Sequence, residues 1–140
     1  MASLSLERSL KMAKVCNKII SFIPGIHFVS VINKNGRMIY TKLSDDSNIK
    51  NLTQQELEML YIQRTLQTCM NKELDKKLGS LHYIISGRDC MLEFIFPFNN
   101  EIIFIVTNND LSIQYTVSQI SELFKELELK TMIEIGDEIA

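Results

Sequence analysis

The chain has 140 residues, of which 46% are hydrophobic and 23% charged, a composition typical of one globular domain rather than of a disordered or fibrous protein. Its formal net charge of -2 at pH 7 is too little positive charge for a nucleic-acid-binding surface. Its three cysteines are widely spaced, which fits neither a disulfide framework nor a zinc site, and the first residues lack the apolar core of a secretory signal. We therefore expect a cytoplasmic protein that binds neither nucleic acid nor metal.

A first helix is predicted from Ser3 to Ile23, because apolar residues recur there every three or four positions and Pro24-Gly25 ends the run. The positions of its apolar stripe are Met12, Val15, Cys16, Ile19 and Ile23. On the opposite face are Lys11, Lys14 and Lys18. Three lysines are a small charge for attraction to an anionic membrane, so we expect a solvated face and no membrane partner.

A β-hairpin is predicted around Asn35-Gly36, which lies between two β-rich runs. A two-residue turn at this pair would place Val31 opposite Tyr40 and Val29 opposite Lys42. Both faces of the resulting hairpin carry large apolar side chains, whereas a sheet with one side in water should alternate. The sequence therefore predicts a sheet that is covered on both sides.

A long middle helix is predicted from Thr53 to Leu78, with Thr53 and Glu56 as a capping box at its start and Gly79 at its end. Its main apolar stripe, which we assign to the sheet, is Met59, Ile62, Leu66, Met70 and Leu74. A smaller apolar flank lies off this stripe and consists of Leu57 and Tyr61, accompanied by Arg64 and Thr68. Such a second flank predicts a surface for a partner protein.

The rest of the chain predicts three strands and a last helix. The strands are Leu81–Ser86, Cys90–Phe96 and Glu101–Thr107, the first of them more polar and hence an edge strand. The helix runs from Ser112 to Leu129. We accordingly divide the chain into a single domain, residues 1–130, and an acidic C-terminal tail, residues 131–140. The predicted order is helix, two strands, helix, three strands, helix.

Two segments in this order, IPGIHFVSVINKNGRMIY and MLEFIFPFNNEIIFIVTNND, resemble the roadblock/LC7 proteins, which are related to the longin and profilin-like folds. The resemblance covers residues 8–128. It implies an α+β fold whose five-stranded antiparallel sheet has the first and last helices on one face and the middle helix on the other. The segment KKLGSLHYIISGRDCMLEFIFPF is also similar to small proteins of ammonia-oxidising archaea, which bring no assigned activity.

The resemblance also implies a function. Roadblock proteins typically dimerise through the middle helix and the neighbouring strand, and then bind small GTPases or serve as adaptors. It therefore implies a non-enzymatic, homodimeric scaffold or regulator with a protein partner, a small GTPase by analogy. Carried onto this sequence, the dimer or partner interface would be Leu57, Tyr61, Arg64, Thr68, His82 and Ile84. The residues themselves fit a homodimer and a heterodimer equally.

Few residues offer chemistry. A two-residue turn at Gly87-Arg88 would place His82 opposite Glu93, the one charge in an apolar strand. We interpret this polar pair as a cross-strand ion pair near the dimer, because no nucleophile or second acid accompanies it. The sequence contains no phosphate-binding loop and no CxxC, HExxH or GxSxG motif, so we expect no catalytic residues, no cofactor and no enzymatic activity. The alternative is a small-molecule sensor with a ligand pocket between sheet and helix, near His82 and Glu93.

Overall fold

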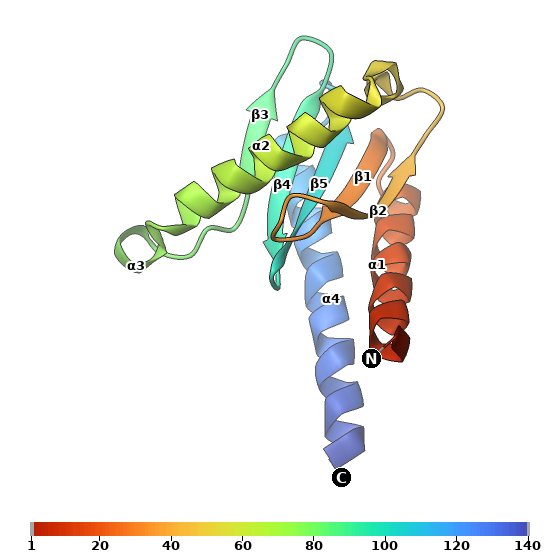
Figure 1. Ribbon diagram of the computed structural model, residues 1–140, viewed down its shortest axis with the longest axis vertical. Helices are drawn as coiled ribbons and strands as arrows, with labels where there is room; N and C mark the ends of the chain where they lie inside the picture. Colours follow the sequence, from red (N-terminus) through yellow and green to blue (C-terminus); the bar gives the residue numbers. More distant parts are fainter. Residues whose placement is uncertain (1, 140) are drawn as a thin grey trace. The chain divides into compact units, whose positions relative to one another are not determined.

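The structure is a computed structural model that describes the backbone of residues 2–139 and the side chains of residues 10–126. In chain order its elements are α1 (Ala2–Phe22), β1 (Ile26–Ile32), β2 (Met38–Leu43), the 3₁₀ helix η1 (Asn48–Asn51), α2 (Gln54–Lys72), α3 (Asp75–Leu78), β3 (Ile84–Gly87), β4 (Leu92–Phe98), β5 (Glu101–Thr107) and α4 (Ile113–Ile139) (Figure 1). The predicted α+β order is confirmed, with two short helices added. The chain forms two compact units, residues 1–109 and 110–140.

The first unit is built on one five-stranded sheet with the order β2-β1-β5-β4-β3. Every neighbouring pair of strands is antiparallel, as predicted. Helix α2 crosses the front face of this sheet in Figure 1, and α1 lies behind β1 and β2. The sheet therefore has a helix on each face, and its two edges are β2 and β3.

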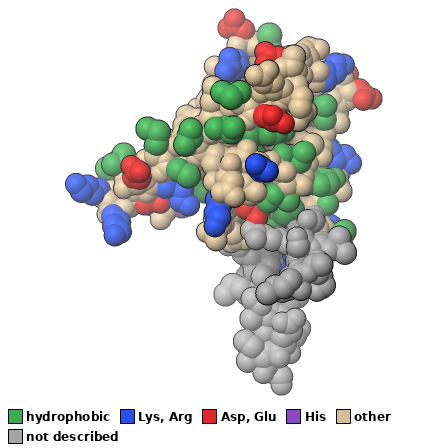
Figure 2. All heavy atoms as spheres, viewed as in Figure 1, with side chains coloured by type: hydrophobic (Ala, Val, Ile, Leu, Met, Phe, Trp, Pro, Cys, Tyr) green, Lys and Arg blue, Asp and Glu red, His purple; other side chains and the backbone are tan. Residues whose placement is uncertain are grey.

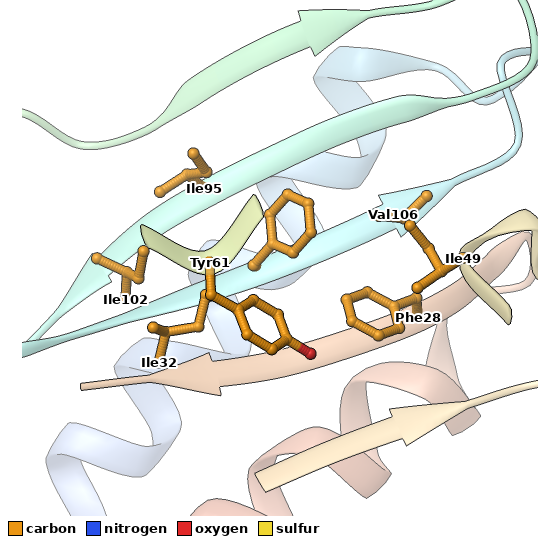
Figure 3. Close-up of a cluster of buried hydrophobic side chains, with 8 residues drawn as sticks. Phe28, Ile32, Ile49, Tyr61, Ile95, Ile102 and Val106 are labelled. Carbon is orange, nitrogen blue, oxygen red and sulfur yellow. The ribbon is translucent and has the colours of Figure 1, made fainter. Parts of the chain in front are cut away.

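The core between α2 and the sheet is a cluster of large apolar side chains (Figure 3). Its members are Phe28, Ile32, Ile49, Tyr61, Ile95, Ile102, Phe104 and Val106. The rings of Phe28 and Phe104 meet edge to face with centroids 5.7 Å apart, a geometry worth about 0.5–1.5 kcal/mol beyond the area that it buries. On the other face, the predicted apolar stripe of α1 is buried throughout, from Met12 to Ile23.

The β1–β2 hairpin has the predicted pairing of Val31 with Tyr40, but its turn is longer than the two residues predicted. The side-chain Oδ1 of Asn33 accepts hydrogen bonds from the backbone N–H groups of Asn35 and Arg37, at 2.9 and 3.0 Å. The backbone N–H of Asn33 in turn donates to the Arg37 carbonyl at 2.8 Å. This side-chain acceptor favours a wider loop, and a bulge between Val31 and the next residue absorbs the change of register.

The start of α2 matches the prediction closely. The Thr53 hydroxyl accepts from the Glu56 backbone N–H at 3.1 Å, and the Glu56 carboxylate accepts from the Thr53 N–H at 2.9 Å. The end differs, because the helix stops at Lys72 and a separate turn, α3, leads to Gly79 at φ +92°. The capping box fixes where α2 enters the sheet face, and hence which of its residues face inward.

The remaining boundaries shift by a few residues. Strand β5 has the predicted bounds, whereas β3 begins at Ile84 rather than at Leu81. In the second unit, α4 follows Ser112, whose carbonyl accepts from the Thr116 hydroxyl at 2.8 Å. The predicted acidic tail continues this helix to Ile139, and its side chains lie outside the described residues. Across the described residues, no helix combines the length and apolar character needed to cross a bilayer.

Candidate interaction surface

The outward side of α2 carries a stripe of exposed apolar side chains. We call Met59, Ile62, Leu66 and Met70 the outer stripe; they are 51%, 43%, 57% and 67% exposed. Figure 2 looks onto α2 and shows hydrophobic side chains spread along this face of the molecule. A contiguous apolar strip of this kind on a folded domain marks an interaction site more often than a solvated surface.

The inward face of α2 carries the residues that the sequence assigned to a partner surface, and this prediction is wrong. Tyr61 is 3% exposed and points into the core between Phe28 and Ile32 (Figure 3). Leu57 packs against the same cluster, and Thr68 is buried. The two faces of the helix are therefore exchanged relative to the prediction.

Hydrogen bonds within the helix explain how its more polar face can be buried. The Thr65 hydroxyl donates to the carbonyl of Tyr61 at 2.9 Å, and the Thr68 hydroxyl donates to the carbonyl of Arg64 at 2.8 Å. Each threonine thus satisfies its own hydroxyl inside the helix and presents a methyl group to the sheet. Burial raises the pKa of the Tyr61 phenol, while weaker contacts with the Ser30 hydroxyl act in the opposite direction.

Arg64 is also turned inward, because it forms an ion pair with a buried carboxylate. Its Nη2 lies 2.9 Å from Oε2 of Glu93 on β4, and the two side chains are 13% and 2% exposed. Nε of the exposed Arg88 lies 3.8 Å from the same oxygen. Arg64 therefore anchors α2 to the sheet, which corrects its predicted place on the partner surface.

The predicted pairing of His82 with Glu93 is wrong as well. Strand register places Ser86, not His82, opposite Glu93, because the loop between β3 and β4 is longer than two residues. That loop is closed by the backbone N–H of Arg88, which donates to the carbonyl of Met91 at 2.8 Å. His82 precedes β3 and is exposed, and the described residues contain no cluster of groups suited to a metal ion. Ile84 is half-buried on the edge strand, where its role in an interface stays a prediction.

A groove lies beside the first half of α2, and we call it the Glu93 groove. It has a volume of about 870 Å³ between η1, α2 and the β3–β4 loop. Its apolar lining is Ile49, Leu52, Met59, Leu60 and Met91. Its charged lining is Glu56, Arg88, Asp89 and Glu93, of which only Glu93 is buried. The groove lies at Glu93, where the alternative prediction expects a ligand pocket, and His82 does not line it; its use as a ligand site stays a prediction.

A buried hydrogen-bonded pair also ties the loop before α2 to the sheet. Nδ1 of His27 on β1 lies 2.8 Å from the Ser47 hydroxyl, which caps η1 by accepting from the Ile49 backbone N–H at 3.3 Å. Burial lowers the pKa of His27, and a backbone hydrogen bond at Thr107 and the charge of Asp46 act in the opposite direction. This pair positions one wall of the Glu93 groove, and no local sequence pattern indicates it because the partners are 20 residues apart.

Comparison with solved structures places the fold among roadblock/LC7 domains. MglB from Myxococcus xanthus is similar over 96% of this chain and 93% of its own, with a TM-score of 0.69 and 14% identity. A roadblock/LC7 domain from Streptomyces avermitilis is similar over 84% of this chain and 95% of its own, with a TM-score of 0.64 and 8% identity. A structure described as MglB with tetrameric arrangement covers 87% of this chain and 91% of its own, with a TM-score of 0.59 and 11% identity.

These identities are too low to transfer more than the fold. No protein-family model matches the sequence, and neither does the sequence of any curated protein. The class that the fold defines is that of roadblock-like α+β domains, several of whose solved members are described as gliding or roadblock proteins.

Proposed function

We propose that this chain is a cytoplasmic, non-enzymatic module that forms a homodimer through the outer stripe of α2 and acts as a scaffold or regulator for a protein partner. The observation that carries the proposal is the exposure of four large apolar side chains, Met59 to Met70, on the outward side of α2. Water would solvate these side chains unfavourably in a monomer, and a second copy would shield them.

The charges along α2 favour a second copy of the same chain as the occupant. The first turns carry Glu56 and Glu58, a formal charge of -2, whereas residues 72–78 contain three lysines against two acids. A twofold axis across the stripe would place the helices antiparallel, with each acidic start facing a basic end. The unpaired edge of β3 lies at the end of the same sheet and could continue the ladder across the axis.

The test is a charge placed at the middle of the outer stripe. Leu66 is 57% exposed, which for a leucine is on the order of 100 Å², and its burial at about 25 cal/mol/Å² contributes about 2.5 kcal/mol. A twofold dimer buries two copies of Leu66, so this free energy is lost twice. We therefore expect Leu66→Glu to raise the dimer Kd by a factor of about 100 or more. Leu43→Glu is the matched control, because it places the same charge on an exposed leucine outside the proposed interface. Leu43 is 43% exposed on β2, the edge of the sheet opposite to β3.

Light scattering after gel filtration at micromolar concentration reads the result directly. The proposal expects a dimer for the unmodified chain and for Leu43→Glu, and a folded monomer for Leu66→Glu. A dimer that persists in Leu66→Glu would refute the assignment of this surface. A monomer for the unmodified chain would refute the homodimer.

The small GTPase as partner is proposed from the roadblock resemblance. We expect the dimer to bind a small GTPase from the same genome and to discriminate between the forms loaded with GDP and with a non-hydrolysable GTP analogue. Calorimetric titration of each form into the dimer is the measurement. Absence of binding to every such GTPase in both forms would remove this partner and leave the scaffold role to another protein.

A further inference from the structure

We propose that the Glu93 groove is a binding site for a small molecule with an apolar body and a cationic, hydrogen-bond-donating head group, an ammonium or amidinium, received by Glu93. The groove belongs to a single chain, so this inference does not rest on the homodimer. It concerns a ligand site, which shares Met59 with the outer stripe.

One oxygen of the Glu93 carboxylate has no hydrogen-bond partner among the described residues. Oε2 of Glu93 is held by Arg64, but Oε1 of the same carboxylate is buried and has no hydrogen-bond donor among the described residues. A buried carboxylate oxygen without a donor is costly, since charged groups lose most when they leave water unpaired. Glu93 is 1% exposed and lines the groove, so the proposal places the head group against its carboxylate.

The charged residues that line the groove are mostly acidic. Three carboxylates, those of Glu56, Asp89 and Glu93, face one guanidinium, that of Arg88, which gives a formal charge of -2. Counting Arg64 behind Glu93 leaves -1. A cationic head group is therefore favoured over an anionic one, which both the net charge and the free lone pairs of Glu93 would repel.

The groove is large enough for a small molecule and has apolar side chains to cover part of it. Its volume of about 870 Å³ falls within the range of small-molecule sites, roughly 300–1,000 Å³. Five large apolar side chains contribute to the lining, among them Leu60 and Met91, and they would cover an aromatic or aliphatic body. The polar and charged residues that share the lining, Glu93 among them, can orient one end of such a ligand.

The chain offers a built-in reporter of occupancy. Cys90 is exposed and lines the groove, whereas Cys69 is exposed on α2 and does not line it. The probes are 4-phenylbutylamine and 4-phenylbutyrate, which share one shape and differ in the sign of their charge. We expect the amine to slow alkylation of Cys90 by iodoacetamide several-fold while Cys69 reacts at its ordinary rate, and the acid to leave both rates unchanged.

Two variants test the head group and the body separately. Glu93→Gln keeps the shape and an acceptor for Arg64 but removes the charge, so the amine should bind about tenfold more weakly or worse. Gln55→Trp changes an exposed lining residue and should fill the groove without disturbing the core, which keeps the test valid if Glu93→Gln fails to fold. The proposal is overturned if 4-phenylbutyrate protects Cys90 as well as 4-phenylbutylamine does, or if millimolar amine gives Cys90 no protection. It is also overturned if the amine still protects Cys90 in Gln55→Trp.

Discussion

We expect the ion pair between Arg64 and Glu93 to contribute strongly to the packing of α2 on the sheet. A double-mutant cycle can measure the interaction free energy of this pair. Arg64→Met removes the guanidinium that lies 2.9 Å from Oε2 and leaves a carboxylate that is 2% exposed without its main partner. Loss of one member of a buried pair costs about 3–5 kcal/mol. Arg88 remains 3.8 Å away but is 60% exposed and solvated, so we expect the lower end, about 3 kcal/mol.

The second arm of the cycle replaces both charges. Arg64→Met with Glu93→Met should recover most of the lost stability, because an apolar pair of similar volume needs no desolvation of charge. Urea unfolding followed by circular dichroism gives the free energy of unfolding, and one protein concentration must be kept throughout because dimerisation shifts apparent stability. A cost below about 1 kcal/mol for Arg64→Met, with additive effects in the double variant, would refute this account.

Three further predictions concern the burial and strain seen in the first unit. Tyr61→Asp should cost about 4 kcal/mol or more by placing a carboxylate in the core, whereas Tyr61→Phe should keep a cooperative urea transition. Gly36→Ala should cost more in thermal unfolding than Gly79→Ala, because both have positive φ but only at Gly36 would a Cβ lie 3.3 Å from atoms of Ile62. Because the pKa of His27 is lowered in the folded state, the unfolded chain binds the extra proton, and the free energy of unfolding should fall as the pH drops below about 6.5. His27→Gln should flatten that part of the pH profile, and an unchanged slope would contradict the assignment.

Features that depend on near neighbours in the sequence could be predicted. The capping box of Thr53 and Glu56, the stop at Pro24-Gly25 and the continuous apolar run of β5 each depend on residues only a few positions apart. The covered sheet followed from apolar side chains on both faces of the hairpin. Where the prediction failed locally, as in the β1–β2 turn, the cause was a single side-chain acceptor, that of Asn33.

The orientation of α2 could not be predicted in the same way, because it depends on partners far away in the chain. Arg64 pairs with Glu93, 29 residues further along the chain on β4. The predicted register of β3 against β4 was also wrong, because the loop between them is longer than expected. Hydrophobic periodicity shows that a helix has two unlike faces, but it ranks them by polarity alone. Thr65 and Thr68 count as polar in that ranking, although each hydroxyl is satisfied within the helix.

The exchange of faces strengthens the case for a partner. Had the larger apolar stripe of α2 faced the sheet, the leftover flank would have been one leucine and one tyrosine beside an arginine, a surface that water tolerates well. Instead the less apolar face of α2 packs on the sheet, where an ion pair and threonine hydroxyls bonded within the helix satisfy its polar groups. The outer stripe from Met59 to Met70 stays exposed. A monomer under selection for solubility alone would carry polar residues at those positions. The side chains of α2 are therefore explained best if the outer stripe has a second surface to cover it.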